Sequence, residues 1–308
     1  MDAAHEKIAI AKLSVYSNAG LVALKVIVGL LMGSVAVLSE AIHSGVDLLA
    51  ALIARFSVKK SAEPADKDHR FGHGKYENLS GFVEGALIFV AAAGIIYSAI
   101  IKFLEEFEID LIPAGMAVMG ISAVVNFLVS RKLMDVAKRT DSLALEADAY
   151  HLKTDVWTSV GVFLALGLIQ LTNIHPLDPA IAMVVASFII KAAYDITRRS
   201  AEGLVDYTLP DEEIRLIERI MKDHQSDYVN FHKLRARKAG SERQIDLHLT
   251  VSRHLNIKEG HDLAEHLAHE IRKEFPQSVV VIHVEPCDEK CDKCKMSPPE
   301  TAFTGTRE

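Results

Sequence analysis

Two apolar segments of this chain carry the same pair of polar residues, a histidine followed four positions later by an aspartate. The pairs are His43 with Asp47 and His151 with Asp155. Residues four apart lie on one face of a helix, one turn apart. An ionisable side chain in the bilayer core costs on the order of 3 kcal/mol, so it is a functional candidate by default.

Together the two pairs offer two imidazole nitrogens and two carboxylate oxygens, which suit a tetrahedral site for a divalent metal. Separate interhelical hydrogen bonds are the alternative interpretation of these four residues. The shared spacing and residue order favour a single metal site.

The chain combines a membrane part with a charged, soluble part. Half of its 308 residues are hydrophobic, yet the last third is rich in charge, a mixture that indicates two domains. The modest acidic balance argues against a nucleic-acid partner. We expect an all-α transmembrane domain over residues 1–204, a soluble domain over 205–286 and a flexible tail over 287–308. Six apolar runs are long enough to cross about 30 Å of hydrocarbon, and they cover residues 8–31, 35–58, 79–103, 111–131, 143–171 and 178–198.

The charges between these runs predict their orientation. Connections after the second, fourth and sixth runs are basic, whereas the other connections lack Lys and Arg. The positive-inside rule therefore places both termini in the cytoplasm. The second and fifth runs then cross in opposite directions, which brings both His–Asp pairs to mid-membrane depth at about 1.5 Å per residue. Lys25, far along the first run, is interpreted as a snorkelling side chain that extends toward the outer surface.

The basic connection over residues 64–75 contains a second group of metal-binding residue types. Asp66, His69 and His73 could bind one divalent ion, and the neighbouring glycines give the backbone freedom to wrap around it. A solvated basic loop anchored near lipid headgroups explains the same composition equally well.

The soluble part has the pattern of a small α+β sandwich in the order α-β-β-α-β. The predicted elements cover residues 210–223, 228–238, 243–252, 258–274 and 278–285. His248 alternates with leucines and so faces away from the apolar side of its strand. His283 and Glu285 share a strand face, His261 lies on the second helix, and His232 begins the first strand. Ordinary surface histidines are the alternative interpretation.

All three cysteines lie near the C-terminal end. Cys287, Cys291 and Cys294 form a Cys-x3-Cys-x2-Cys pattern that could bind a soft metal ion, although three thiols leave a tetrahedral set incomplete. A flexible tail with idle thiols is the alternative. Cysteines in a tail cannot cross-link the fold, so a reducing cytosolic setting is expected.

From the first run to about Pro286, the chain resembles the cation diffusion facilitators, and most closely their bacterial zinc and iron efflux members. Three motifs carry the resemblance: Ser39-Glu40-Ala41-Ile42-His43-Ser44-Gly45-Val46-Asp47, Phe71-Gly72-His73-Gly74-Lys75 and Asp148-Ala149-Tyr150-His151-Leu152-Lys153-Thr154-Asp155. The resemblance implies a homodimer in the bacterial inner membrane, with six helices per protomer and a cytoplasmic domain of metallochaperone-like, ferredoxin-like fold. It also implies export of a divalent metal against inward proton flow.

The resemblance further implies roles for individual residues. The two His–Asp pairs match the family's transport site, and Asp66, His69 and His73 match its loop site. The family's cytoplasmic binuclear site at the dimer interface corresponds to His232, His248, His261, His283 and Glu285. Lys75 and Asp206 occupy positions that can pair between protomers. Some relatives have Asp in place of His43, which shifts metal preference, and Asp is usual where this chain has Glu285.

These observations predict a secondary active transporter, not an enzyme. Two nitrogens and two oxygens suit Zn²⁺ best, and the affinity order alone does not exclude Fe²⁺, Co²⁺, Ni²⁺ or Cd²⁺. The same zinc could also act as a regulatory ligand in the soluble domain. A membrane-anchored metal sensor and a membrane metalloenzyme are the rival classes, and the latter lacks a His-Glu-x-x-His motif.

Overall fold

The computed structural model describes residues 3–32, 35–104, 113–172 and 177–288. Contacts divide the chain into two compact units. The first comprises Met1–Val205 with Ala239–Ser241, and the second comprises Asp206–Lys238 with Glu242–Glu308.

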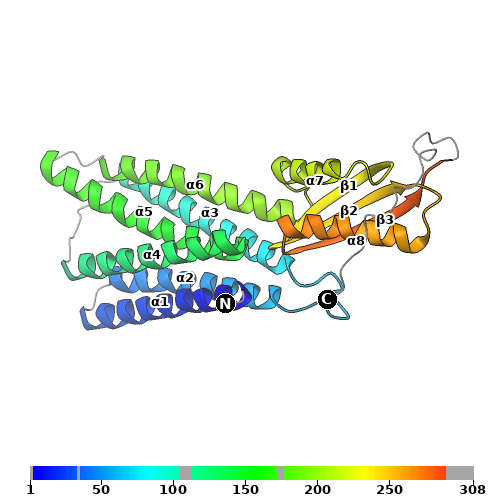
Figure 1. The fold of residues 1–308 in the computed structure, drawn as a ribbon. Coiled ribbons are helices and arrows are strands. Elements are labelled where there is room, and N and C mark those ends of the chain that lie inside the picture. Colours follow the sequence, from blue (N-terminus) through cyan, green and yellow to red (C-terminus); the bar gives the residue numbers. More distant parts are fainter. Residues whose placement is uncertain (1–2, 33–34, 105–112, 173–176, 289–308) are drawn as a thin grey trace. The chain divides into compact units, whose positions relative to one another are not determined.

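Six long helices make up the first unit within the described residues (Figure 1). They are α1 (Ala3–Met32), α2 (Val35–Ser61), α3 (Lys75–Leu104), α4 (Pro113–Thr140), α5 (Leu143–Thr172) and α6 (Leu177–Leu204). The most extensive packing joins α3 with α6, α1 with α2 and α4 with α5, while α5 also contacts α2 and α3. This arrangement brings the two helices that carry the His–Asp pairs into contact.

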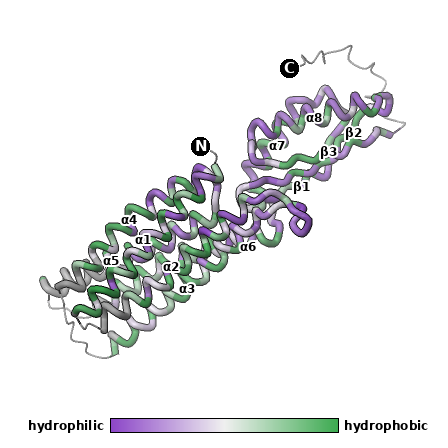
Figure 2. Tube along the Cα trace, turned by 90° about the horizontal axis from the view of Figure 1, so that it is seen from below, coloured by the Kyte–Doolittle hydropathy of each residue, from purple (hydrophilic) through white to green (hydrophobic). Residues whose placement is uncertain are grey.

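Helix length and hydropathy mark four of these described helices as candidate membrane spans: Ala3–Leu31, Ala41–Ser61, Lys75–Ile101 and Pro179–Leu204. Figure 2 shows the apolar character of this unit as long stretches of green. Helices α4 and α5 are as long as the others but are not among the candidate spans found within the described residues. The expectation of six spans therefore stays a prediction, as do the expected domain limits.

Close approach of α3 to α6 depends on small residues. A Cβ added at Gly85 would collide with Thr197 and press on Ile196, and one added at Gly81 would collide with Ser200. Beside this contact, Ile88 and Ala92 of α3 pack with Ile189 and Ala193 of α6. Small residues allow this kind of close packing between helices in a membrane. Lipid tails are as apolar as the side chains, so no hydrophobic force drives the helices together.

The second unit follows the predicted order of elements. It contains α7 (Asp211–Asp223), β1 (Asn230–Ala239), β2 (Glu242–Val251), α8 (Ile257–Glu274) and β3 (Ser278–Pro286). The sheet order is β1-β2-β3, and β3 runs parallel to β2 with His248 opposite His283. Asn256 caps α8 in a reciprocal capping box with Glu259. The small α+β domain with a three-stranded sheet agrees with the sequence prediction.

One face of this sheet builds the core. Ile245, Leu247 and Leu249 of β2 are fully buried against Leu267 and Ile271 of α8, and Ile217 and Met221 of α7 join the same cluster. Because strand side chains alternate between faces, His248 lies on the opposite face. Helices α7 and α8 therefore cover one face of the sheet, and the histidines lie on the other face.

Candidate metal-transport site

Helices α2 and α5 bring the two His–Asp pairs to one place. Ligand atoms of His43, Asp47 and Asp155 lie within 4.8 Å of one another. The fourth predicted residue, His151, is held at Asp47, where its Nε2 lies 3.0 Å from Oδ1 of the carboxylate. Asp47 and His151 are buried, whereas His43 is exposed. Three of the four predicted residues thus form one cluster, and the fourth contacts it through Asp47.

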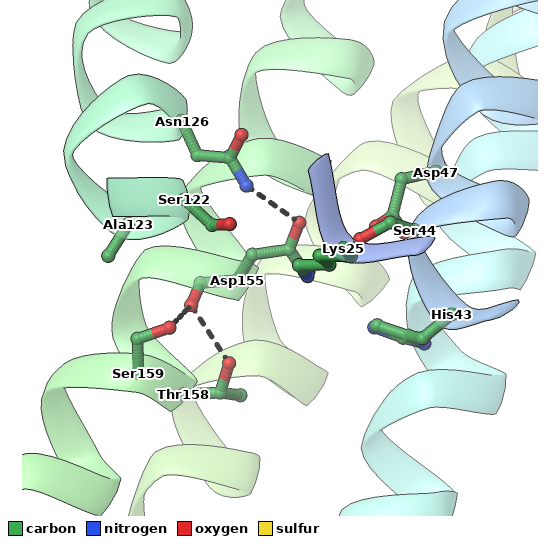
Figure 3. Close-up of a pocket in the computed structure, with 10 residues that line it drawn as sticks. All are labelled: Lys25, His43, Ser44, Asp47, Ser122, Ala123, Asn126, Asp155, Thr158 and Ser159. Atoms are coloured by element: carbon green, nitrogen blue, oxygen red, sulfur yellow. Dashed lines mark hydrogen bonds between the residues drawn. The ribbon is translucent and has the colours of Figure 1, made fainter. Parts of the chain in front are cut away.

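A cavity of about 150 Å³ lies beside this cluster, and its polar lining adds residues that the sequence interpretation had not assigned to the site (Figure 3). Asn126 of α4 donates from Nδ2 to Oδ2 of Asp155 at 3.3 Å. Thr158 and Ser159 donate to the backbone carbonyl of Asp155. Asn126 therefore orients a carboxylate, the supporting role that outer-shell partners play at metal sites.

Lys25 of α1 also reaches this cavity. Its ammonium is buried and donates to Ser44 Oγ at 2.7 Å. Ser44 stands next to His43 in the chain and one turn before Asp47. The interpretation of Lys25 as a snorkelling residue is therefore wrong. The physical reason is that Ser44 and the polar lining of the cavity give the ammonium a hydrogen-bonding environment inside the helix bundle.

Two further acids are buried within the same bundle. Glu84 of α3 and Asp148 of α5 are both fully buried. Ser80 donates to Glu84 at 2.8 Å. Although Asp148 lies near the start of α5, neighbouring helices cover this face of the helix and keep the carboxylate away from water.

The loop residues Asp66, His69 and His73 also converge, with ligand atoms within 4.8 Å of one another. The Asp66 carboxylate accepts hydrogen bonds from the backbone N–H groups of His69 and Asp68, and the first of these is the main reason why the pKa of Asp66 lies below its ordinary value. Asp66 Oδ2 lies 3.2 Å from His73 Nε2. Gly72 adopts φ +81°, a left-handed conformation that suits glycine in this turn.

The hydrogen bond between His73 and Glu63 sets which ring nitrogen faces Asp66. His73 Nδ1 lies 3.3 Å from the backbone carbonyl of Glu63, which can only accept, so Nδ1 carries the proton. In the neutral ring Nε2 then presents a lone pair toward the Asp66 carboxylate. Two acceptors 3.2 Å apart need a cation between them or a proton on the ring. The His73 side chain is nearly fully buried, which fixes this orientation.

A third cluster lies on the open face of the sheet. His232 Nε2 lies 3.0 Å from Glu285 Oε1, and His248 Nδ1 lies 3.2 Å from Oε2. These hydrogen bonds and charges, that of His248 first, hold the pKa of Glu285 below its ordinary value. The ring of His283 lies 4.7 Å from that of His248. Carboxylate and imidazole groups in this arrangement match zinc ligation.

An irregularity in β1 turns His232 toward this cluster. Phe231, Leu234 and Ala236 all pack against the core, so the alternation of the strand breaks between them. The break falls at Lys233, whose φ of +52° lies in the left-handed region. An inserted residue of this kind is a β-bulge in its effect on side-chain direction. The sequence pattern of β1 does not predict this irregularity.

The remaining predicted residues are placed less conclusively. His261 is exposed on α8 and does not belong to the described cluster of His232, His248 and Glu285. Asp206 pairs with Arg237 at 2.6 Å, and Lys75 donates to the carbonyl of Leu204. Cys287 is buried and disulfide-bonded, so the expectation of reduced thiols in the tail is wrong at this residue. Cys291 and Cys294 lie outside the described residues.

Both units match models of known protein families. Residues 11–205 match the cation efflux transmembrane domain, and residues 209–287 match the cytoplasmic domain of cation efflux proteins, a dimerisation domain. The chain therefore belongs to the cation efflux family of multi-pass membrane transporters, which transport transition-metal cations. The resemblance seen in the sequence motifs is confirmed.

The chain is similar to two curated relatives over most of its length and to one solved structure over about a quarter of it. An uncharacterized transporter, sll1263, of Synechocystis sp. is 38% identical over 83% of each chain. The cation-efflux pump FieF of Pectobacterium atrosepticum is 32% identical over 82% of this chain and 84% of its own. A solved structure of CzrB in its zinc form is 30% identical, with a TM-score of 0.26, and covers 27% of this chain and 94% of that one.

Proposed function

We propose that this protein is a divalent metal cation:proton antiporter that exports Zn²⁺ from the cytoplasm by alternating access. The observation that carries the proposal is the convergence of His43, Asp47 and Asp155 beside a polar cavity, with His151 held at Asp47. Two imidazoles and two carboxylates form a donor set that suits tetrahedral zinc. Fe²⁺, Cd²⁺, Co²⁺ and Ni²⁺ are the competing substrates.

The proposed arrangement in the membrane follows the loop charges. The six helices of the first unit span the bacterial inner membrane, with both termini in the cytoplasm, and two copies of the chain form a homodimer. Lys75 and Asp206 are proposed to pair between protomers near the membrane.

The proposed exchange follows from ligand chemistry. An imidazole binds metal only when its coordinating nitrogen is unprotonated, so zinc and protons compete at His43 and His151. When the site faces the cytoplasm, neutral imidazoles and ionised carboxylates hold the ion. Rocking of the helices then turns the site outward, where a lower pH favours protonation and release. The inward proton flow in this way drives the outward metal flow.

The loop and the soluble domain are proposed as additional, regulatory zinc sites. Asp66, His69 and His73 form the loop site, where the two opposed acceptors favour a bound cation. His232, His248, His283 and Glu285 form the cytoplasmic site, and His261 is retained in it as a ligand that a dimer contact would bring in. A soft-metal site at Cys287, Cys291 and Cys294 is kept as a proposal for the reduced protein, because Cys287 is disulfide-bonded in this structure.

Uptake of radioactive zinc into inverted membrane vesicles tests the antiporter directly. Vesicles made acidic inside should accumulate zinc with wild-type protein, and collapse of the pH gradient should abolish accumulation. Asp47→Ala and Asp155→Ala should reduce uptake to the level of empty vesicles, because each removes a metal-binding carboxylate. Asp135→Ala, which alters an exposed acid on α4, is the matched control.

The same assay separates the rival classes. A metal sensor or a membrane metalloenzyme would bind zinc without accumulating it, so gradient-independent binding alone would rule out the antiporter for this metal. Competition with the other divalent ions then ranks the substrates.

A further inference from the structure

Lys25 places a basic side chain at the proposed metal cavity. Its side chain is 6% exposed, and its ammonium donates to Ser44 Oγ at 2.7 Å (Figure 3). Ser44 belongs to the turn of α2 that also carries His43 and Asp47. Asp155 of α5 lines the same cavity as Lys25. The ammonium is therefore anchored to the ligand-bearing turn, and Lys25 lines the same cavity as both carboxylates of the site.

We infer that Lys25 is a resident counter-cation, which neutralises part of the empty metal site and opposes the metal when it is bound. The inference rests on the proposed function. The cavity contains two carboxylates, Asp47 and Asp155, and a divalent ion balances them when it binds. When the ion leaves, two negative charges would remain buried together, and Lys25 offsets one of them.

Both halves of this role follow from Coulomb's law in a cavity of low dielectric constant. An uncompensated charge is costly to bury. An empty site with two bare carboxylates would therefore reorient slowly from the outward-facing to the inward-facing state, or would first have to bind extra protons. With zinc bound, the ammonium and the ion repel each other, which weakens binding and speeds release. Lys25 therefore lowers the affinity of the site for zinc and raises the rate of the transport cycle.

The simplest alternative is that Lys25 only secures α1 to α2 through Ser44. That role predicts lower stability when Lys25 is replaced, with no gain in zinc affinity. The counter-cation role predicts the opposite sign for affinity, because removal of the ammonium removes a charge that repels zinc. The two roles are therefore separated by the direction in which zinc binding changes.

The experiment compares Lys25→Met with wild type, using full-length protein in detergent for zinc binding and in proteoliposomes for zinc flux. Lys25→Met keeps the length of the side chain and loses the charge. We expect zinc to bind roughly tenfold more tightly, with KM and kcat for transport both lower. We also expect more protons to enter per zinc exported, because an extra proton must replace the lost charge.

Two further variants control the comparison. Lys25→Arg keeps the charge and should stay near wild type in affinity and in proton-to-zinc ratio. Lys153→Met changes an exposed lysine of α5 whose ammonium lies 5.0 Å from the ring of Trp157, outside the cavity lining, and should change neither quantity.

Unchanged or weaker zinc binding by a folded Lys25→Met protein would overturn the inference while leaving the antiporter intact. Failure of the wild type to couple zinc flux to the pH gradient is a different result, and it would overturn the proposed function instead. A zinc–zinc exchange assay without a gradient shows that each variant is folded and moves metal across the membrane.

Discussion

At the scale of single residues, hydrogen bonds prepare the proposed ligands before any metal arrives. The carbonyl of Glu63 fixes the tautomer of His73, and Asn126 orients the carboxylate of Asp155. Backbone N–H groups keep Asp66 ionised. The contacts to His73 and Asp155 fix the orientation of two proposed ligands, and those to Asp66 favour its ionised form, which a divalent cation requires.

Glu285 gives a pH-dependent prediction at this scale. Its folded pKa lies below the ordinary value of 4.5, chiefly because the ionised carboxylate pairs with His248. A lowered folded pKa contributes stability above the unfolded pKa, and the contribution is lost as pH falls through the folded pKa. We therefore expect Glu285→Gln to lower the thermal midpoint of the soluble domain at pH 6, and the difference from wild type to shrink below about pH 4.5.

Thermal melts of the full-length protein between pH 7 and pH 3 measure this difference. Glu218→Gln, which changes an exposed acid on α7, is the control and should follow wild type throughout. A difference between Glu285→Gln and wild type that grew on acidification would contradict the assignment of the pair.

At the scale of elements, one buried carboxylate joins several helices of the first unit. Glu77 of α3 pairs with Lys7 of α1 at 2.7 Å, and both side chains are almost fully buried. Ser61 of α2 donates to Oε1 of Glu77 at 2.9 Å, and Ser142, just before α5, donates to Oε2. This network holds together the same helices that carry the transport site, α2 and α5, at one end of the bundle.

Glu77→Ala should therefore destabilise the bundle strongly. It leaves the Lys7 ammonium buried without its carboxylate, a change that typically costs about 3–5 kcal/mol. Chemical denaturation in detergent measures the loss. Glu77→Gln should lose less, because the amide oxygen still accepts from one of the two serine hydroxyls and the amide nitrogen can donate to the other. Glu63→Ala, which breaks an exposed pair with Lys60, is the control. Equal stability of Glu77→Ala and wild type would show that the network is not a structural joint.

At the scale of the whole molecule, the chain combines a membrane transporter with a dimerisation domain that has its own proposed metal cluster. Metal that binds one state of a protein more tightly than another shifts the population toward that state, and the shift is reciprocal between sites. Zinc at His232, His248 and Glu285 would in this way favour the dimer arrangement that is competent for transport.

Replacement of both His248 and His283 by Ala tests this linkage. We expect transport by the double variant to lose its stimulation by cytoplasmic zinc, because the proposed regulatory cluster loses two imidazoles, while the transport site keeps all four of its residues. Initial rates across a series of zinc concentrations, with sedimentation to follow the dimer, provide the measurement. His266→Ala with His269→Ala, on α8, is the matched double control. An unchanged zinc dependence would rule out regulation through this cluster.

The sequence alone determined the order of elements, because hydropathy and alternation act locally. The alternation along β2 placed Leu247 and Leu249 in the core and His248 on the other face. The spacing of the His–Asp pairs indicated which two helices carry the candidate metal ligands. The family assignment followed from motifs of the same local kind. Helix spacing could not, however, show what lies opposite each polar residue.

Only the tertiary structure decided which polar residues meet. It turned Lys25 into a cavity-lining cation, buried Asp148 and directed His232 through the irregularity at Lys233. The reason is physical: a buried charge is positioned by partners on other helices, and those partners are separated from it by many residues in the chain. Spacing within one segment therefore identifies candidate ligands, whereas packing between segments sets the charge around them.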